Sequence, residues 1–215
     1  KKVEKIFYIC EKGAAVPKAD RVEVVPVQGV EGAKDALSAV LTSGRIDAVV
    51  HSMAVSDYAV ESLTTREDLS GFLARRLFSL GPDAFRSEEA LAGLLAGLIR
   101  ENDRLLDRDG KIGSDLDHPM ISMKRTPKLI GLVKKLQPSA ILVGFKLLDG
   151  AEEQKLLDVA YELLQKNSCD FVLANDSRNI GDGRHVGFLI SSDRSYVRLE
   201  TKEKIAEEIA RRVLD

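Results

Sequence analysis

The sequence has almost no net charge and few cysteines, and each shortage excludes a class of protein. Its 215 residues include 32 Lys and Arg and 34 Asp and Glu, which gives a formal net charge of −2. A nearly neutral chain offers no general electrostatic attraction to nucleic acid or to an anionic membrane. The 2 cysteines, Cys10 and Cys169, lack the spacing of metal ligands, so we expect buried side chains in a reducing compartment.

Long apolar runs and glycine-rich phosphate motifs are absent as well. No run is long enough for a membrane span and no signal peptide opens the chain, so we predict no membrane partner and a cytoplasmic location. Because Gly-x-Gly-x-x-Gly, Walker-type and Gly-x-Ser-x-Gly motifs are missing, an unrelated sugar-nucleotide or dehydrogenase-like protein is disfavoured. The 3 histidines, His51, His118 and His185, share no ligand spacing, and we predict no metal held by protein ligands.

What the sequence does contain is an alternation of apolar strands and amphipathic helices. The predicted strands are 6–10, 22–27, 46–50, 140–143 and 171–174, with a hairpin of 186–190 and 196–199. The predicted helices are 29–42, 127–136, 151–166 and 201–214, and residues 175–184 are predicted as a polar loop. This order predicts an α/β fold: a three-layer, Rossmann-like, mostly parallel sheet with helices on both faces.

The stretch 59–119 interrupts this pattern within what we predict to be a single domain, 1–215. It holds helical patterns at 69–80 and 87–106, and then a Gly-, Asp- and Ser-rich segment, 107–117, that predicts a mobile loop. An insertion between two strands of a sheet serves as a lid, a dimerisation arm or decoration. The sequence leaves these three roles open.

Polar and aromatic residues follow the predicted strands at the point where each strand ends. In an open parallel sheet, ligands bind beyond the carboxyl ends of the strands. The residues at those ends are 53–58, 144–146, Asn175 and Asp176. Thr126 and Pro127 predict a helix start with Thr126 as its cap, and the free backbone N–H groups of a helix start suit a phosphate. These positions predict a site for a small molecule or a nucleotide.

Each candidate also has a purely structural explanation, and the residues alone do not decide between the two. Asp57 could bind a ribose hydroxyl or a metal, or it could cap a loop. Phe145 could stack a base or belong to the core. Asn175 and Asp176 could cap the turn that follows them. The same ambiguity, phosphate contact or solvated charge, applies to three lysines: Lys111, Lys146 and Lys166.

Taken in order, these segments resemble phosphopantothenoylcysteine synthetase, the phosphopantothenate–cysteine ligase of coenzyme A synthesis. The resemblance covers nearly the whole chain and is closest to the stand-alone bacterial enzymes. It is carried by Met-Ala-Val-Ser-Asp-Tyr (53–58), Lys-Ile-x-Ser (111–114), Thr-Pro-Lys (126–128), Val-Gly-Phe-Lys-Leu-Leu (143–148), Lys-Asn (166–167) with Asp170, and Ala-Asn-Asp (174–176).

The resemblance implies a role for each matched residue. Lys111 would be a catalytic lysine in a flexible flap, although Gly113 stands where the family has a second flap lysine. Asn175 and Asp176 would bind substrate. The implied nucleotide site consists of Asp57, Thr126, Pro127, Lys128, Leu129, Phe145 and Lys166.

The resemblance also implies a reaction and its partners. The carboxylate of 4′-phosphopantothenate would be activated as an acyl-nucleotide, with CTP favoured over ATP and Mg²⁺ as cofactor, and cysteine would then form the amide. Family members are homodimers. The family begins with a strand, a glycine-rich turn and an Asn-x-Ser segment, which would precede Lys1, so we expect them in a longer chain. The rival reading is a non-catalytic nucleotide-binding module that keeps the fold and lacks this loop.

Overall fold

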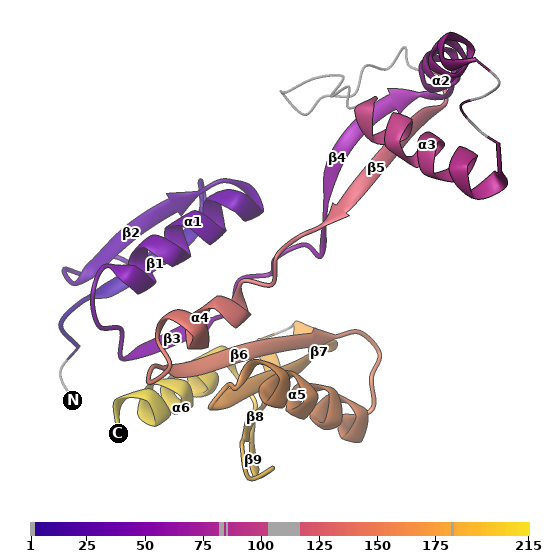
Figure 1. Ribbon diagram of the computed structural model, residues 1–215. Coiled ribbons are helices and arrows are strands. Elements are labelled where there is room, and N and C mark those ends of the chain that lie inside the picture. Colours follow the sequence, from indigo (N-terminus) through magenta and orange to yellow (C-terminus); the bar gives the residue numbers. More distant parts are fainter. Residues whose placement is uncertain (1–2, 82–83, 85, 103–116, 182) are drawn as a thin grey trace. The chain divides into compact units, whose positions relative to one another are not determined.

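The computed structural model describes residues 3–81, 84, 86–102, 117–181 and 183–215 (Figure 1). The chain forms two compact units, and each is treated by itself. The first combines Lys1–Val55 with Pro127–Asp215, and the second is Ser56–Thr126. The prediction of one domain with an insertion at 59–119 stays a prediction. Residues 107–116 of the predicted mobile loop lie outside the described residues.

The described strands of the first unit form a parallel pair and a five-stranded sheet (Figure 1). In the larger sheet, the order is β3-β6-β7-β8-β9; β3, β6 and β7 are parallel, whereas β8 is antiparallel to both of its neighbours, β7 and β9. This confirms the prediction of a mixed α/β fold with a mostly parallel central sheet. The strands are β1 (Ile6–Glu11), β2 (Val22–Val27), β3 (Ala48–His51), β6 (Ile141–Leu148), β7 (Phe171–Gly181), β8 (Arg184–Ser191) and β9 (Tyr196–Leu199).

Helices cover both faces of the five-stranded sheet. Along β6 the side chains alternate, as the pleat requires: Leu142 packs in one apolar cluster and Val143 in another. The first cluster joins the sheet to α1 (Gly29–Thr42), α4 (Ile130–Leu136) and α5 (Glu153–Asn167). The second joins the opposite face to α6 (Lys202–Leu214) through Ile205 and Ile209. Strands buried on both faces explain the continuous apolar runs in the sequence.

Local signals in the sequence set several helix boundaries. In α1, buried Ala33, Leu37 and Leu41 recur every four residues and form its inner stripe. Thr201 caps α6 as predicted, because its side chain accepts a hydrogen bond from the Lys204 backbone N–H at 3.3 Å. The α1 terminus is held by Gln137, whose side-chain amide donates to the Leu41 and Gly44 carbonyls.

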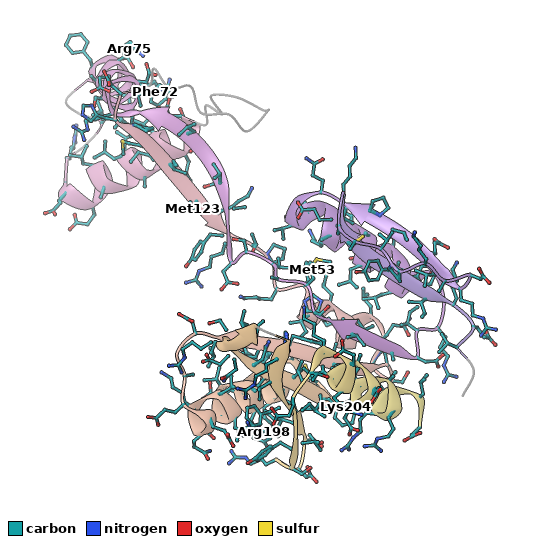
Figure 2. All side chains as sticks on the ribbon, turned by 180° about the vertical axis from the view of Figure 1, so that it is seen from behind. Met53, Phe72, Arg75, Met123, Arg198 and Lys204 are labelled. Atoms are coloured by element: carbon teal, nitrogen blue, oxygen red, sulfur yellow. The ribbon has the colours of Figure 1, made fainter. Side chains whose placement is uncertain are left out.

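The second unit contains an antiparallel pair, β4 (Tyr58–Thr65) and β5 (Pro119–Arg125), with α2 (Arg66–Leu80) and α3 (Glu88–Glu101). Thr65 and Ser87 cap the two helices by accepting hydrogen bonds from Asp68 N–H and Ala90 N–H. Figure 2 labels Phe72 and Arg75 on α2 and Met123 on β5. The sequence did not predict the strands, because every residue of β5 is exposed and no alternation of apolar and polar residues marks it.

Two predictions are wrong. The helix expected from Pro127 begins only at Ile130, after Leu129. Thr126 is therefore no helix cap: its backbone N–H donates to the Asp57 carbonyl at 3.0 Å and its hydroxyl donates to the Ser56 carbonyl. The polar loop expected at 175–184 is mostly strand, since β7 continues to Gly181 and pairs with β8. Pairing with a neighbouring strand outweighed the local preference of Asn, Asp and Ser for turns.

Candidate functional site

A small open pocket lies between β6 and the C-terminal half of α5. It has a volume of about 180 Å³ and is lined by Lys146, Val159, Glu162, Leu163 and Lys166. The helix residues follow the i, i+3, i+4, i+7 spacing of one face, and Lys146 faces them from the strand. Two of the predicted phosphate-binding lysines thus meet in one pocket. Neither ammonium group is paired with a carboxylate among the described residues.

Two ammonium groups beside one pocket favour an anion as its occupant. Lys166 also has a structural explanation, because it lies in the last turn of α5, where a cation complements the helix dipole. That explanation does not extend to Lys146, which belongs to a strand and is half-buried. The position of Lys146 therefore favours phosphate contact over a solvated charge.

Phe145 lies on the other face of β6. It is half-buried and packs against the cluster that includes Val143, Leu173 and Ile205, on the side covered by α6. Because neighbouring residues of a strand point to opposite faces, Phe145 and Lys146 cannot line the same pocket. The structure brings Lys146 and Lys166 together but separates both from Phe145.

Asn175 is also on the α6 face, in the middle of β7 and not at its carboxyl end as predicted, because the strand continues to Gly181. It is 8% exposed, and its Nδ2 lies 3.1 Å from Nε2 of His185 on β8. Burial lowers the pKa of His185, and the charge of Lys202 lowers it further. The other ring nitrogen, Nδ1, is buried and has no hydrogen-bond partner among the described residues. His185 thus lies beside a predicted binding residue, in surroundings that disfavour its charged form.

Asp176 is 1% exposed, and its carboxylate already has several donors. It accepts hydrogen bonds from Ala151 N–H at 2.7 Å, Arg178 N–H at 3.0 Å and Arg178 Nε at 3.1 Å. Burial by itself raises the pKa of Asp176, but the two backbone donors and the Arg178 guanidinium outweigh it and lower this pKa to about 2. These contacts tie the loop before α5 to the middle of β7, which supports the structural explanation of Asp176.

The remaining predicted site residues are distributed over both units. Asp57 is exposed and belongs with Thr126 to the second unit. In the first unit, Pro127 is half-buried, Lys128 is exposed and Leu129 is 2% exposed within the core. The structure thus brings Asp57 and Thr126 together through a backbone hydrogen bond. The catalytic candidate, Lys111, lies outside the described residues.

The sequence interpretation missed two residues of these clusters. Glu162 could have been found, because it lies one helical turn before Lys166 and so on the same face of α5. His185 could not, because its contact with Asn175 depends on β7 extending beyond Ala174 to pair with β8.

The described residues include no group of three or more His, Cys, Asp or Glu side chains arranged to hold a metal ion. Both cysteines are buried and unpaired, as predicted. Burial, and then repulsion by Asp170, raises the pKa of the Cys169 thiol to about 11. Within the described part of the chain, no helix is long and apolar enough to cross a membrane.

Comparison with known proteins gives one family and several relatives. The coenzyme A biosynthesis bifunctional protein CoaBC of Thermococcus kodakarensis is 33% identical over 92 residues, which are 42% of this chain and 23% of that protein. The chain therefore matches about a quarter of the length of this relative.

Two solved structures share the fold. The DNA/pantothenate metabolism flavoprotein of Streptococcus pneumoniae superposes with a TM-score of 0.74 at 25% identity, covering 98% of this chain and 80% of its own. A Cab2 variant in complex with phosphopantothenate-cysteine gives a TM-score of 0.54 at 15% identity, covering 90% of this chain and 53% of its own. At that identity the second likeness shows the fold alone.

The family assignment rests on a longer match than the pairwise identities. The sequence model of the DNA/pantothenate metabolism flavoprotein C-terminal domain matches residues 106–215, just over half of the chain. The matched stretch contains β6, α5, β7, β8 and α6, which carry the lysine pocket and the Asn175–His185 pair. The chain belongs to the DNA/pantothenate metabolism flavoprotein C-terminal domain family.

Proposed function

We propose that this chain forms the nucleotide-binding part of a phosphopantothenate–cysteine ligase. A carboxylate oxygen of 4′-phosphopantothenate attacks the α-phosphorus of a nucleoside triphosphate, and pyrophosphate leaves. The amine of cysteine then attacks the acyl carbon, an amide bond forms, and the nucleoside monophosphate leaves with the electron pair of the broken C–O bond. CTP is favoured over ATP by the bacterial character of the motifs.

Family membership over residues 106–215 is the observation that carries this proposal. The similar protein from Thermococcus kodakarensis is named for coenzyme A biosynthesis, and the Cab2 structure contains phosphopantothenate-cysteine. The lysine pocket adds a physical argument, because Lys146 and Lys166 can offset the charge of a triphosphate or of the departing pyrophosphate.

The nucleotide residues are assigned in two groups that can be tested separately. Lys166, with Lys146, contacts phosphate, whereas Phe145 contacts the base or another flat group on the opposite face of β6. The proposal keeps the other predicted roles. Asp57, Thr126, Pro127, Lys128 and Leu129 contact nucleotide, Asn175 and Asp176 contact substrate, and Lys111 closes on the reacting groups.

Mg²⁺ fits this site only as a partner of the nucleotide. In the described part of the chain no cluster of three acidic or histidine side chains is available, and Glu162 is the carboxylate in the lysine pocket. Mg²⁺ is commonly held by one or two carboxylates together with substrate phosphates. When bound there, it would offset phosphate charge.

The experiment measures pyrophosphate release by the full-length protein with CTP or ATP, 4′-phosphopantothenate and cysteine. We expect release that requires phosphopantothenate and is faster with CTP. Lys166→Ala should lower kcat/KM for the nucleotide by about tenfold or more, as expected for a lost charge-assisted phosphate contact. Lys155→Ala is the matched control, since Lys155 is exposed on the same helix outside the pocket. Nucleotide binding without any release would instead support the non-catalytic module.

The proposal includes a further strand in the first unit. β1 and β3 each have an edge to which no described strand pairs. Doubly wound sheets have the strand order 3-2-1-4-5-6. In that order, β2 and β1 fit positions 3 and 2, and β3, β6 and β7 fit positions 4, 5 and 6, which leaves position 1 between β1 and β3. A strand from upstream residues would fill that central position. Amides of β1 and β3 should then exchange hydrogen more slowly in the full-length protein than in the isolated chain, and equal rates would argue against it.

A homodimer and a cytoplasmic location are also part of the proposal. The β4–β5 ribbon exposes large apolar side chains, among them Val60 at 53% and Met123 at 55%. Exposed apolar side chains grouped on one ribbon are typical of an interaction surface. Light scattering on the full-length protein should give the mass of a dimer, and Val60→Lys with Met123→Lys should reduce it to that of a monomer.

A further inference from the structure

The pair formed by Asn175 and His185 has a defined direction. Asn175 Nδ2 and His185 Nε2 are 3.1 Å apart. An amide NH₂ group only donates hydrogen bonds, so the ring nitrogen that faces it must accept. A neutral imidazole has one donor and one acceptor nitrogen, and its proton is then on Nδ1.

This arrangement has a cost that the described residues do not offset. His185 Nδ1 is buried and has no partner among the described residues. A buried N–H without an acceptor destabilises a fold, whereas an apolar side chain of similar shape would avoid the loss. The folded core therefore gives no reason for a histidine at this position.

The two side chains lie on a closely packed face of the sheet. They lie on the sheet face covered by α6, and Gly187 occupies the intervening position on β8, opposite Asn175. A Cβ at Gly187 would lie 3.1 Å from Ile205 Cδ1 and 3.2 Å from Leu173 Cδ1. This backbone position on β8 is therefore closely packed against α6 and β7, two residues from His185.

The other end of the Asn175 amide remains available. Among the described residues none donates a hydrogen bond to Oδ1, and this atom is not among the buried atoms that lack a partner. Oδ1 therefore keeps its capacity to accept a hydrogen bond, on a residue that is 8% exposed. It is an acceptor in the middle of β7 (Phe171–Gly181).

We propose that His185 is a positioning residue: it holds the Asn175 amide with its NH₂ toward the ring and its carbonyl oxygen toward the substrate. The group that meets Asn175 is then a hydrogen-bond donor, an amine or a hydroxyl, and not a carboxylate or a phosphate. This inference rests on the proposed function, because it assumes that Asn175 contacts substrate.

The direction of the pair is tested without any activity measurement. Nitrogen-15 NMR of the histidine rings in the full-length protein distinguishes the two neutral tautomers. We expect His185 to have its proton on Nδ1. A proton on Nε2 would mean that the amide is reversed and that its NH₂ faces the substrate, which would overturn the proposal.

The role of the pair is tested by kinetics and thermal unfolding of four full-length variants: His185→Leu, His185→Gln, Asn175→Ala and the double variant His185→Leu/Asn175→Ala. His185→Leu should lower kcat/KM for phosphopantothenate or cysteine by about tenfold, the effect of one misplaced hydrogen bond. Its melting temperature should not fall. His185→Gln, whose side-chain oxygen can accept from Asn175, should recover most of the activity.

The double variant separates positioning from a general structural role. If His185 acts through Asn175, then His185→Leu should have no further effect on kcat/KM once Asn175 is alanine. Independent, multiplicative losses would contradict the proposal, and so would full activity of His185→Leu. A wild-type protein that releases no pyrophosphate would refute the proposed function, while the NMR result would still decide the direction of the pair.

Discussion

The two compact units differ in how they are held together. The first contains two extensive apolar clusters, with Val133, Leu142 and Val143 fully buried between sheet and helices. In the second, the buried side chains among the described residues are Leu63, Leu98, Thr64, Thr65 and Asn102. The first unit is thus stabilised by its own core. The second depends on a ribbon, two capped helices and a small polar cluster, and should open locally at lower cost.

The largest expected effect on stability comes from a truncation in the core of the first unit. Leu142→Ala removes a fully buried side chain from β6 and should lower the free energy of unfolding by about 3 kcal/mol, measured by urea denaturation. Leu98→Ala, at 2% exposure in α3, is the matched truncation in the second unit. It should accelerate hydrogen exchange in β4 and β5 and leave β6 protected. Equal loss of protection in both units would show that they unfold as one.

A smaller effect is expected at the polar cluster of the second unit. Asn102 donates a hydrogen bond from Nδ2 to Thr64 Oγ1 at 3.3 Å, and both side chains line a cavity of about 110 Å³. Asn102→Ala should cost about 1 kcal/mol, the net contribution of one buried hydrogen bond. The check is faster amide exchange in α3 with an unchanged urea midpoint for the first unit. A shift of that midpoint would contradict the separation of the units.

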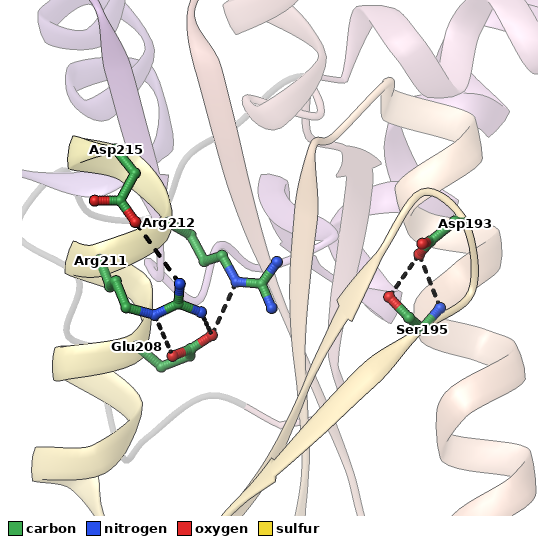
Figure 3. A network of polar contacts seen from close by, with 6 residues as sticks. All are labelled: Asp193, Ser195, Glu208, Arg211, Arg212 and Asp215. Carbon is green, nitrogen blue, oxygen red and sulfur yellow. Dashed lines mark hydrogen bonds and ion pairs between the residues drawn. The ribbon is translucent and has the colours of Figure 1, made fainter.

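The surface ion pairs of α6 should stabilise the first unit by a free energy similar to that of the Asn102 hydrogen bond, and this stabilisation should be lost at acidic pH. Glu208 accepts from Arg211 Nε at 2.9 Å and from Arg212 Nε at 2.8 Å (Figure 3). These hydrogen bonds lower the pKa of Glu208 from 4.5 to about 2. A carboxylate whose pKa is lower in the folded protein than in the unfolded chain stabilises the folded state at pH values above its pKa in the unfolded chain. This stabilisation disappears as the pH falls to its pKa in the folded protein.

Glu208→Gln should therefore cost about 1 kcal/mol at neutral pH and almost nothing near pH 2. The measurement is urea unfolding of both proteins across that range. A cost that does not change with pH would show that Glu208 acts by packing. Glu207→Gln is a matched control, because Glu207 forms an ion pair with exposed Lys204 on the same helix.

The smallest effect on stability is expected on the ribbon of the second unit. Val60 is 53% exposed, whereas Leu63, three residues along the same strand, is 7% exposed. Val60→Lys should change the stability of the isolated protomer by less than about 0.5 kcal/mol, and Leu63→Lys should unfold the second unit. Thermal unfolding at low protein concentration compares them. A large loss from Val60→Lys under those conditions would mean that Val60 is buried within the protomer.

The sequence predicted most of the first unit and little of the second. Apolar runs and helix caps such as Thr201 gave the order and type of the elements of the first unit, because each depends on neighbours within one turn or one strand. Strands β6 and β7 extend to Leu148 and Gly181, beyond their predicted ends, where pairing with other strands continues. The ribbon was missed because β4 and β5 are more than fifty residues apart and β5 has no buried side. The prediction of Thr126 as a helix cap was wrong because a Thr-Pro pair looks the same in the sequence in both cases. Its hydroxyl can cap a helix or, as here, donate a hydrogen bond to a distant carbonyl.

By itself the sequence determined the α/β class and the resemblance to a ligase family. These follow from local periodicity and from the order of motifs. Only the tertiary structure decided which candidates share a face. Lys146 and Lys166 line one pocket between β6 and α5, whereas adjacent Phe145 packs on the α6 side, because the pleat of β6 sends neighbouring side chains to opposite faces. His185 reaches Asn175 only because β7 and β8 pair beyond the apolar core.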